Sequence, residues 1–252
     1  MLQTPRFLLF DYGETLAHED DYRAQDGFNA ILKYADPPAN VDGDALLAAF
    51  RETFHELRRK AHAAGVEIPN RQRWRWLFET FDLRFRLPMD ALEEIYWNAA
   101  APCVPTPGME ELLTRLRANG VRTGVISNMG FAGTSLRHRI ERLYPNHRFD
   151  PVLSSADYVL RKPNPRLFQL ALKKAGFAPE ETWFLGDNPQ ADVAGAHAAG
   201  IFPVYYDRDL GCAYRESAPL DPGIPCLRIH DWSELYPFFS HELNTEGAVS
   251  KR

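Results

Sequence analysis

The sequence predicts an α/β protein whose core is a Rossmann-like, doubly wound parallel sheet, interrupted by an inserted all-helical cap domain. Three observations support this fold class. Short apolar runs alternate with amphipathic helical patterns in the second half of the chain, which is typical of a parallel sheet with helices on both faces. Residues 17–100 are helical in pattern and poor in strands. Polar residues follow several apolar runs, at the strand ends where open α/β sheets bind ligands.

The first apolar run is FLLF at residues 7–10, and it predicts a strand buried on both faces. The strand ends on Asp11, whose carboxylate should face the ligand crevice. Gly13 and Thr15 permit a sharp turn and put a hydroxyl beside that carboxylate. The structural alternative for this stretch is a strand followed by an ordinary Asx turn.

After Leu16 a polar connector leads into four amphipathic segments with the 3.6-residue period of helices, separated by prolines. We expect them to form an insertion with its own small core. Because the insertion follows the first strand directly, it should cover the carboxyl ends of the strands as a lid. Arg71, Arg73 and Arg75 alternate with two tryptophans there; the pattern favours a solvated face over a cationic wall above a phosphate.

From Ala101 onward, strands and helices alternate. Strands are predicted at 121–126, 150–154, 182–185, 202–206 and 226–229, and helices at 109–119, 136–144, 165–175, 193–200 and 231–239. This order predicts a discontinuous core over 1–16 and 101–240, a helical cap over 17–100 and a frayed tail over 241–252.

The composition excludes several classes of protein. A net charge of −5 gives no footprint for nucleic acid or an anionic membrane, and no apolar run reaches the length of a membrane span. Cys103, Cys212 and Cys226 contain no CxxC pair, which argues against a disulfide framework. The early first strand leaves no room for a signal peptide. We expect a cytoplasmic monomer or homodimer.

Four features fall at predicted strand ends or soon after one. They are Asp11, Ser127, Lys162 and the segment GDNPQAD at 186–192. A nucleophilic carboxylate that meets an anionic phosphate needs a cation nearby, and Lys162 supplies one. Two carboxylates from different strands, Asp11 and Asp187, together with a backbone carbonyl suit Mg²⁺, which prefers oxygen ligands.

This ordered set resembles the haloacid dehalogenase-like (HAD) hydrolase superfamily, over about residues 4–15 and 101–240, with a helical cap of the C1 type. The resemblance implies that Asp11 is a nucleophile that forms a phosphoaspartyl intermediate. It implies that the Gly13 carbonyl and Asp187 bind Mg²⁺ together with Asp11.

The same resemblance assigns the remaining site residues. Thr15, Ser127 and Asn128 would contact the phosphate, and Lys162 would stabilise the charge of nucleophile and phosphate. Asp192 would lie in the second coordination sphere, where it orients Lys162 or a metal-bound water.

One position departs from the family pattern Asp-x-Asp-x-Thr. Here the motif reads Asp11-Tyr12-Gly13-Glu14-Thr15, and Gly13 has no side chain to act as general acid. The neighbouring Glu14 should point away. His18 or Glu19, just past the turn, or a cap residue could supply the proton instead, although His18 is also typical of an exposed linker.

The sequence therefore predicts a Mg²⁺-dependent phosphohydrolase of a small phosphorylated metabolite, and it does not identify the substrate. One alternative is phosphonoacetaldehyde-hydrolase-like C–P cleavage through a cap lysine, for which Lys33 and Lys60 are the candidates. Another is a catalytically silent binding or regulatory protein of the same fold. Metal-free dehalogenation is disfavoured, because Asp187 and Asp192 suit a cation.

Overall fold

Six parallel strands form the central sheet of the computed structural model, which describes residues 3–211 and 219–239. The spatial order is β5-β4-β1-β6-β7-β8, with β1 (Phe7–Phe10) in the interior of the sheet. The other strands are β4 (Arg122–Ser127), β5 (Val152–Ser154), β6 (Thr182–Gly186), β7 (Phe202–Tyr206) and β8 (Leu227–Ile229). All four residues of β1 are fully buried, as expected for an apolar run covered on both faces.

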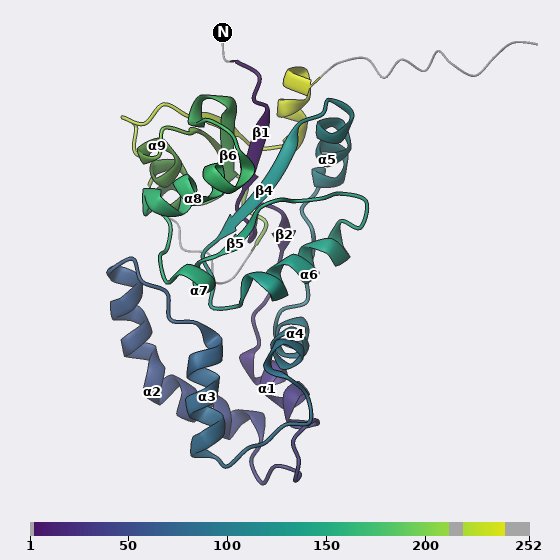
Figure 1. The fold of residues 1–252 in the computed structure, drawn as a ribbon, viewed down its shortest axis with the longest axis vertical. Coiled ribbons are helices and arrows are strands. Elements are labelled where there is room, and N and C mark those ends of the chain that lie inside the picture. The colour runs from purple at the N-terminus through teal and green to yellow at the C-terminus, as the bar shows by residue number, and fades with distance from the viewer. Residues whose placement is uncertain (1–2, 212–218, 240–252) are drawn as a thin grey trace, which may run out of the picture.

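Helices cover both faces of the sheet, which confirms the predicted doubly wound α/β class (Figure 1). On one face lie α5 (Met109–Ala118), α6 (Gly133–Leu143) and the 3₁₀ helix η3 (Trp232–Phe239). On the other lie α8 (Pro165–Ala175) and the short α9 (Gly195–Ala198). Helix α8 begins as predicted: the Asn164 side chain accepts a hydrogen bond from the Arg166 N–H, and Pro165 occupies the first turn.

Four helices between β1 and β4 form the cap, which lies beyond one end of the sheet (Figure 1). They are α1 (Ala24–Leu32), α2 (Gly43–Ala63), α3 (Asn70–Thr80) and α4 (Met89–Ala100). Aromatic rings fill the space between them: Trp74 and Tyr96 have centroids 4.6 Å apart, and Phe28 lies 5.0 Å from Tyr96.

The expectation that the cap has a separate core is wrong. Its buried apolar residues belong to the same cluster as one face of the sheet. Phe131, from the loop after β4, stacks on Trp97 of α4 with centroids 4.3 Å apart. The cap therefore shares apolar packing with the core, because loops that leave the sheet insert their own rings between the cap helices.

The two connections between core and cap run side by side. Residues of the expected polar connector form β2 (Ala17–His18), which pairs antiparallel with β3 (Val104–Pro105). Next to this pair the Thr106 N–H donates to the Leu16 carbonyl at 3.2 Å. The pairing ties the entry into the cap to the exit from it.

Two helical predictions differ in detail from the structure. The segment predicted as a helix over 193–200 begins earlier, as a π-helical turn η2 (Pro189–Ala194) that leads into α9. The last helix is 3₁₀ and contains Pro237, which cannot donate the hydrogen bond of a regular helix.

The structure does not test several of the predictions. The tail over 241–252 and Cys212 lie outside the described residues, within which Cys103 and Cys226 are free thiols. None of the described helices is long and apolar enough to cross a membrane. The cytoplasmic location and the oligomeric state stay predictions.

Candidate functional site

Four of the predicted side chains meet at the carboxyl end of the sheet. Asp11 follows β1 and donates its N–H to the Leu185 carbonyl of β6 at 2.8 Å. Asp187 follows β6 directly, so neighbouring parallel strands deliver both carboxylates to the same edge. Lys162 comes from the loop after α7 (Ser155–Tyr158), and Asp192 from the π-helical turn η2 that follows β6. The structure thus brings Asp11, Lys162, Asp187 and Asp192 together.

The Lys162 ammonium joins two of the carboxylates. Its Nζ lies 2.6 Å from Oδ1 of Asp11 and 2.6 Å from Oδ1 of Asp192, and the residue is 4% exposed. Burial alone would lower the pKa of Lys162, but the two carboxylates outweigh this effect and raise it. The side chain therefore remains a cation beside Asp11 at neutral pH.

Asn128 fixes the backbone that carries this lysine. Its Nδ2 donates to the Lys162 carbonyl at 2.9 Å, and its Oδ1 accepts from the Lys162 N–H at 2.7 Å. Both polar ends of the amide are thus engaged, which leaves the backbone N–H and the second hydrogen of Nδ2 for the predicted phosphate contact. Ser127 is the last residue of β4, is 3% exposed and pairs in register with Ser154 of β5.

Asp192 is held from both sides and is almost fully buried. Its Oδ1 binds Lys162, and its Oδ2 accepts the N–H of Asn188 at 3.0 Å. Gly186 leaves room for it, since a Cβ there would collide with the Asp192 carboxylate. Burial raises the pKa of Asp192, Lys162 opposes this shift, and Asp11 adds to it. With both oxygens engaged, Asp192 is suited to orienting Lys162.

The donor set of the cluster fits a hard divalent cation. Asp11, Asp187 and Asp192 each offer a carboxylate oxygen within 4.8 Å of the others. Three carboxylates facing the single ammonium of Lys162 leave an excess of negative charge that a dication would balance. Oxygen donors of this kind are those that Mg²⁺ prefers. Asp11 and Asp187 follow neighbouring strands directly at this edge, which places them to bind such an ion, and both oxygens of Asp192 are engaged by Lys162 and Asn188.

The turn after Asp11 has an unusual backbone and an open position. Gly13 has space around it, because a Cβ added there meets no atom within 4 Å. Glu14 adopts a left-handed conformation, with φ of 54°, and is 5% exposed. Its carboxylate is not part of the acidic cluster and instead lies 3.0 Å from Nδ1 of His18.

His18 and Glu19, which could replace the missing acid, both interact with other side chains. The His18 side chain is 13% exposed, so it is not an exposed linker residue. Its Nε2 lies 2.6 Å from Oδ1 of Asp20, and although burial lowers the pKa of His18, Glu14 and Asp20 outweigh this and raise it. Glu19 forms an ion pair at 3.0 Å with the buried Arg139.

Thr15 is fully buried, and its hydroxyl has no hydrogen-bond partner among the residues described. Its carbonyl accepts a hydrogen bond from the Thr106 hydroxyl at 2.6 Å. The structure therefore gives Thr15 a contact with the return segment of the core, and it does not join the hydroxyl to the carboxylate cluster.

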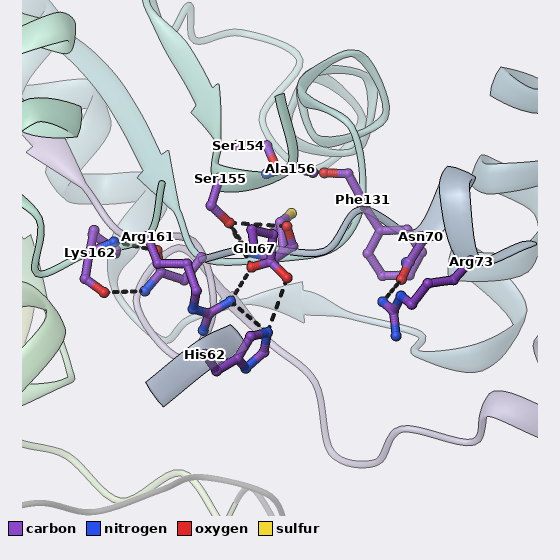
Figure 2. A network of polar contacts seen from close by, with 12 residues as sticks. His62, Glu67, Asn70, Arg73, Phe131, Ser154, Ser155, Ala156, Arg161 and Lys162 are labelled. Atoms are coloured by element: carbon purple, nitrogen blue, oxygen red, sulfur yellow. Dashed lines mark hydrogen bonds and ion pairs between the residues drawn. The ribbon is translucent and has the colours of Figure 1, made fainter. Parts of the chain in front are cut away.

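A polar cluster that the sequence did not predict lies between cap and core. We call it the Glu67 cluster, and it consists of His62, Glu67, Ser155 and Arg161 (Figure 2). Glu67 is 1% exposed, accepts from the Ser155 hydroxyl at 2.9 Å, lies 3.1 Å from Nε2 of His62 and pairs with Arg161. Burial alone would raise the pKa of Glu67, but His62 and Arg161 lower it to about 2.

Backbone hydrogen bonds reinforce the Glu67 cluster. The Glu67 N–H donates to the Val159 carbonyl at 2.6 Å, and the Arg161 N–H donates to the Gly65 carbonyl at 3.0 Å. The cap therefore binds the segment that leads directly into Lys162. The only sequence signal was a lone acidic residue between Val66 and Ile68, which is too weak to predict a buried cluster.

The expectation of a solvated arginine face on α3 holds for one of the three residues. Arg75 is exposed and pairs with Glu79 at 3.2 Å. Arg71 is half-buried and pairs with the buried Glu93 at 2.8 Å. Arg73 is 4% exposed, so for this residue the prediction is wrong: the first turns of α3 lie against the core loop at Gly130.

Comparison with known proteins adds a family match. The model of the family described as haloacid dehalogenase-like hydrolase matches residues 6–200. Phosphoserine phosphatase of Thermus thermophilus is 37% identical over 131 residues, which cover 52% of this chain and 49% of that protein. Glyceraldehyde 3-phosphate phosphatase of Methanopyrus kandleri is 30% identical over 240 residues, 90% of this chain and 94% of that protein.

A solved structure has the same fold. The HAD phosphatase from Thermococcus onnurineus superposes with a TM-score of 0.59 at 20% identity, covering 94% of this chain and 99% of that one. The chain spans about half the length of the curated relatives that it matches with the highest identity.

Proposed function

Because this chain belongs to the haloacid dehalogenase-like hydrolase family, we propose that it is a Mg²⁺-dependent phosphohydrolase that acts on a small phosphorylated metabolite through a phosphoaspartyl intermediate on Asp11. One observation carries the proposal. The Asp11 carboxylate lies 2.6 Å from a buried ammonium, within a cluster of three carboxylates at the carboxyl end of the sheet. The phosphatase names of several relatives support the same reaction class.

The proposed reaction has two steps. A carboxylate oxygen of Asp11 forms a bond to phosphorus, the ester P–O bond breaks, and the leaving oxygen departs with its electron pair. Water then cleaves the acyl phosphate, which releases inorganic phosphate and regenerates Asp11. Lys162, fixed by Asn128 and Asp192, offsets the negative charge that accumulates between nucleophile and phosphoryl group. Ser127 and the Asn128 N–H would bind phosphate oxygens.

Asp11, Asp187 and the Gly13 carbonyl would hold Mg²⁺. When bound, the ion neutralises charge on the phosphoryl group and allows a carboxylate to approach it. The excess of carboxylates over ammonium in the cluster supports this assignment.

The lack of a side chain at Gly13 limits which leaving groups the protein should release efficiently. Without a general acid at this position, an alkoxide would depart unprotonated, whereas an aryl oxide or a carboxylate departs readily without a proton. Aryl and acyl phosphates should thus be cleaved well, and sugar or alkyl phosphates poorly. The C–P cleavage alternative gains no support, since Lys33 and Lys60 are both exposed and Lys60 lies beside Glu56.

Phosphate release from phenyl phosphate and acetyl phosphate, with and without Mg²⁺, tests the proposal. Mg²⁺-dependent turnover that disappears in Asp11→Asn would support it. Turnover in EDTA, or an Asp11→Asn protein with more than a few per cent of wild-type activity, would refute it. Absence of turnover on both substrates would favour a silent binding protein.

A further inference from the structure

Arg73 is a buried cation without a carboxylate partner. One of its terminal nitrogens binds the Asn70 side chain, and its guanidinium lies 4.8 Å from the ring centroid of Phe50 (Figure 2 shows Arg73 and Asn70). Its Nε is buried and has no hydrogen-bond partner among the described residues. Arg71 and Arg75 on the same helix pair with glutamates, whereas no described carboxylate forms an ion pair with Arg73.

The guanidinium lies at the boundary between cap and core, close to the reaction centre. The Asn70 N–H donates to the Gly130 carbonyl at 2.8 Å, and a Cβ built on Gly130 would lie 2.9 Å from a terminal nitrogen of Arg73. Gly130 follows Ser127 by three residues, which span at most about 11 Å. Arg73 therefore lies within the length of a small metabolite from the predicted phosphate site.

Two further arginines face the same region from α2. Arg51 and Arg58 are seven residues apart and so lie on one face of the helix. His62, four residues after Arg58, continues this face and reaches the Glu67 cluster, so the face is turned toward the core. Neither Arg51 nor Arg58 forms an ion pair with a described residue, and both are exposed.

These cations influence the pKa values of the same groups. Burial and then the positive charge of Arg58 lower the pKa of Arg73 to about 10. Burial raises the pKa of Tyr96, which hydrogen-bonds with Tyr22, and the nearby Arg73 and Arg51 oppose this shift. The positive charges of Arg51, Arg58 and Arg73 thus all act on the Tyr22–Tyr96 pair. Among the carboxylates, Glu67 raises the pKa of Arg73, and His62, Ser155 and Arg161 already engage it.

A buried charge is costly unless it is paired, and a planar guanidinium binds carboxylate or phosphate through two parallel hydrogen bonds. We propose that Arg73, assisted by Arg58 and Arg51, binds a second anionic group of the substrate, at the end remote from the phosphoryl group. This inference rests on the proposed function and narrows its substrate class. The preferred substrates are phosphomonoesters that carry a second carboxylate or phosphate.

Calorimetric binding of substrate-like phosphonates tests the site without turnover. The probes are ω-carboxyalkylphosphonates with three to six methylenes, their neutral carboxamide counterparts, and the corresponding alkane bisphosphonates, all in Mg²⁺ buffer. Wild type should bind the best acid at least tenfold more tightly than its amide, which corresponds to about 1.4 kcal/mol. A preference for the bisphosphonate over the carboxylate identifies the second group as a phosphate, and the reverse identifies a carboxylate.

Arg73→Met should abolish the preference for the acid, Arg73→Lys should keep part of it, and Arg58→Ala should weaken it. Arg75→Ala is the matched control, because it removes an exposed and paired arginine two positions further along α3. If Arg73→Met does not fold, Arg58→Ala and Arg73→Lys carry the test.

Equal binding of acid and amide by wild type at every chain length would overturn the proposal. An unchanged preference for the acid in Arg73→Met would also overturn it. If that variant does not fold, an unchanged preference in both Arg58→Ala and Arg73→Lys would do so. Phenyl phosphate has no second anionic group, so its hydrolysis tests the phosphohydrolase proposal separately.

Discussion

Restoring a carboxylate at position 13 should extend the proposed activity to alkyl phosphates. The structure accepts the change, because a Cβ at Gly13 meets no atom within 4 Å and the residue is not in the left-handed region. The backbone bends at Tyr12, and the side chain added by Gly13→Asp would enter open space two residues after Asp11. We expect the leaving oxygen to depart into this space.

Two opposing effects determine how much the rate on alkyl phosphates should rise in Gly13→Asp. A positioned general acid contributes about 10²–10⁴-fold, or roughly 3–5 kcal/mol of barrier. Against this, Gly13→Asp adds a fourth carboxylate to a cluster that already has three and one ammonium. Repulsion between unit charges at 4 Å is about 1 kcal/mol in water and about 4 kcal/mol at an effective dielectric constant of 20. That repulsion favours the protonated form, which the leaving oxygen needs.

The assay is the dependence of log kcat/KM on leaving-group pKa for a series of aryl and alkyl phosphates at saturating Mg²⁺. Wild type should show a steep negative slope, and Gly13→Asp a shallower one because alkyl phosphates gain most. Gly13→Asn is the matched control, since it has the same shape and cannot donate an acidic proton. A flat wild-type slope, or an equal gain in Gly13→Asn, would refute the reasoning, and His18→Ala would then be the next variant.

Three other outcomes are expected. Asp11→Asn should prevent formation of the phosphoenzyme, which rapid-quench trapping measures; a labelled intermediate in this variant would contradict the nucleophile assignment. Asp187→Ala should raise the Mg²⁺ concentration needed for half-maximal activity at least tenfold, and an unchanged titration curve would argue against its role as ligand. The Glu67 pKa of about 2 lies below the usual 4.5, so the ionised Glu67 should contribute about 3 kcal/mol to the free energy of unfolding. This contribution should be complete above pH 4.5 and lost as pH falls toward 2. Glu67→Gln should lower the free energy of unfolding at pH 7 and flatten its pH dependence; parallel curves for variant and wild type would count against this.

Sequence patterns predicted the sheet well because its strands are buried on both faces and therefore read as continuous apolar runs, as residues 7–10 do. The approach of Asp11 to Asp187 also follows from strand order, since the carboxyl ends of parallel strands meet at one edge. These features depend on local composition and on a general rule of topology.

The features that sequence reasoning missed depend on partners far away in the chain. Glu67 is buried because Ser155 and Arg161, about 90 residues further on, surround its carboxylate. Arg73 lies in a charged stretch whose composition is typical of a solvated helix face, but the loop at Gly130 covers it. The β2–β3 pair is only two residues long on each strand, which is too short for any periodicity to reveal.

The Glu67 cluster would couple any motion of the cap to the position of Lys162. If the cap swings about the β2–β3 pair, the contacts of Glu67 with Arg161 must break, and the backbone that enters Lys162 loses the Gly65 carbonyl as a support. An open molecule would thus exchange substrate and product but hold its ammonium less firmly. The fraction of time spent closed then multiplies the chemical rate, so that substitutions in the cap, far from phosphorus, appear as changes in kcat.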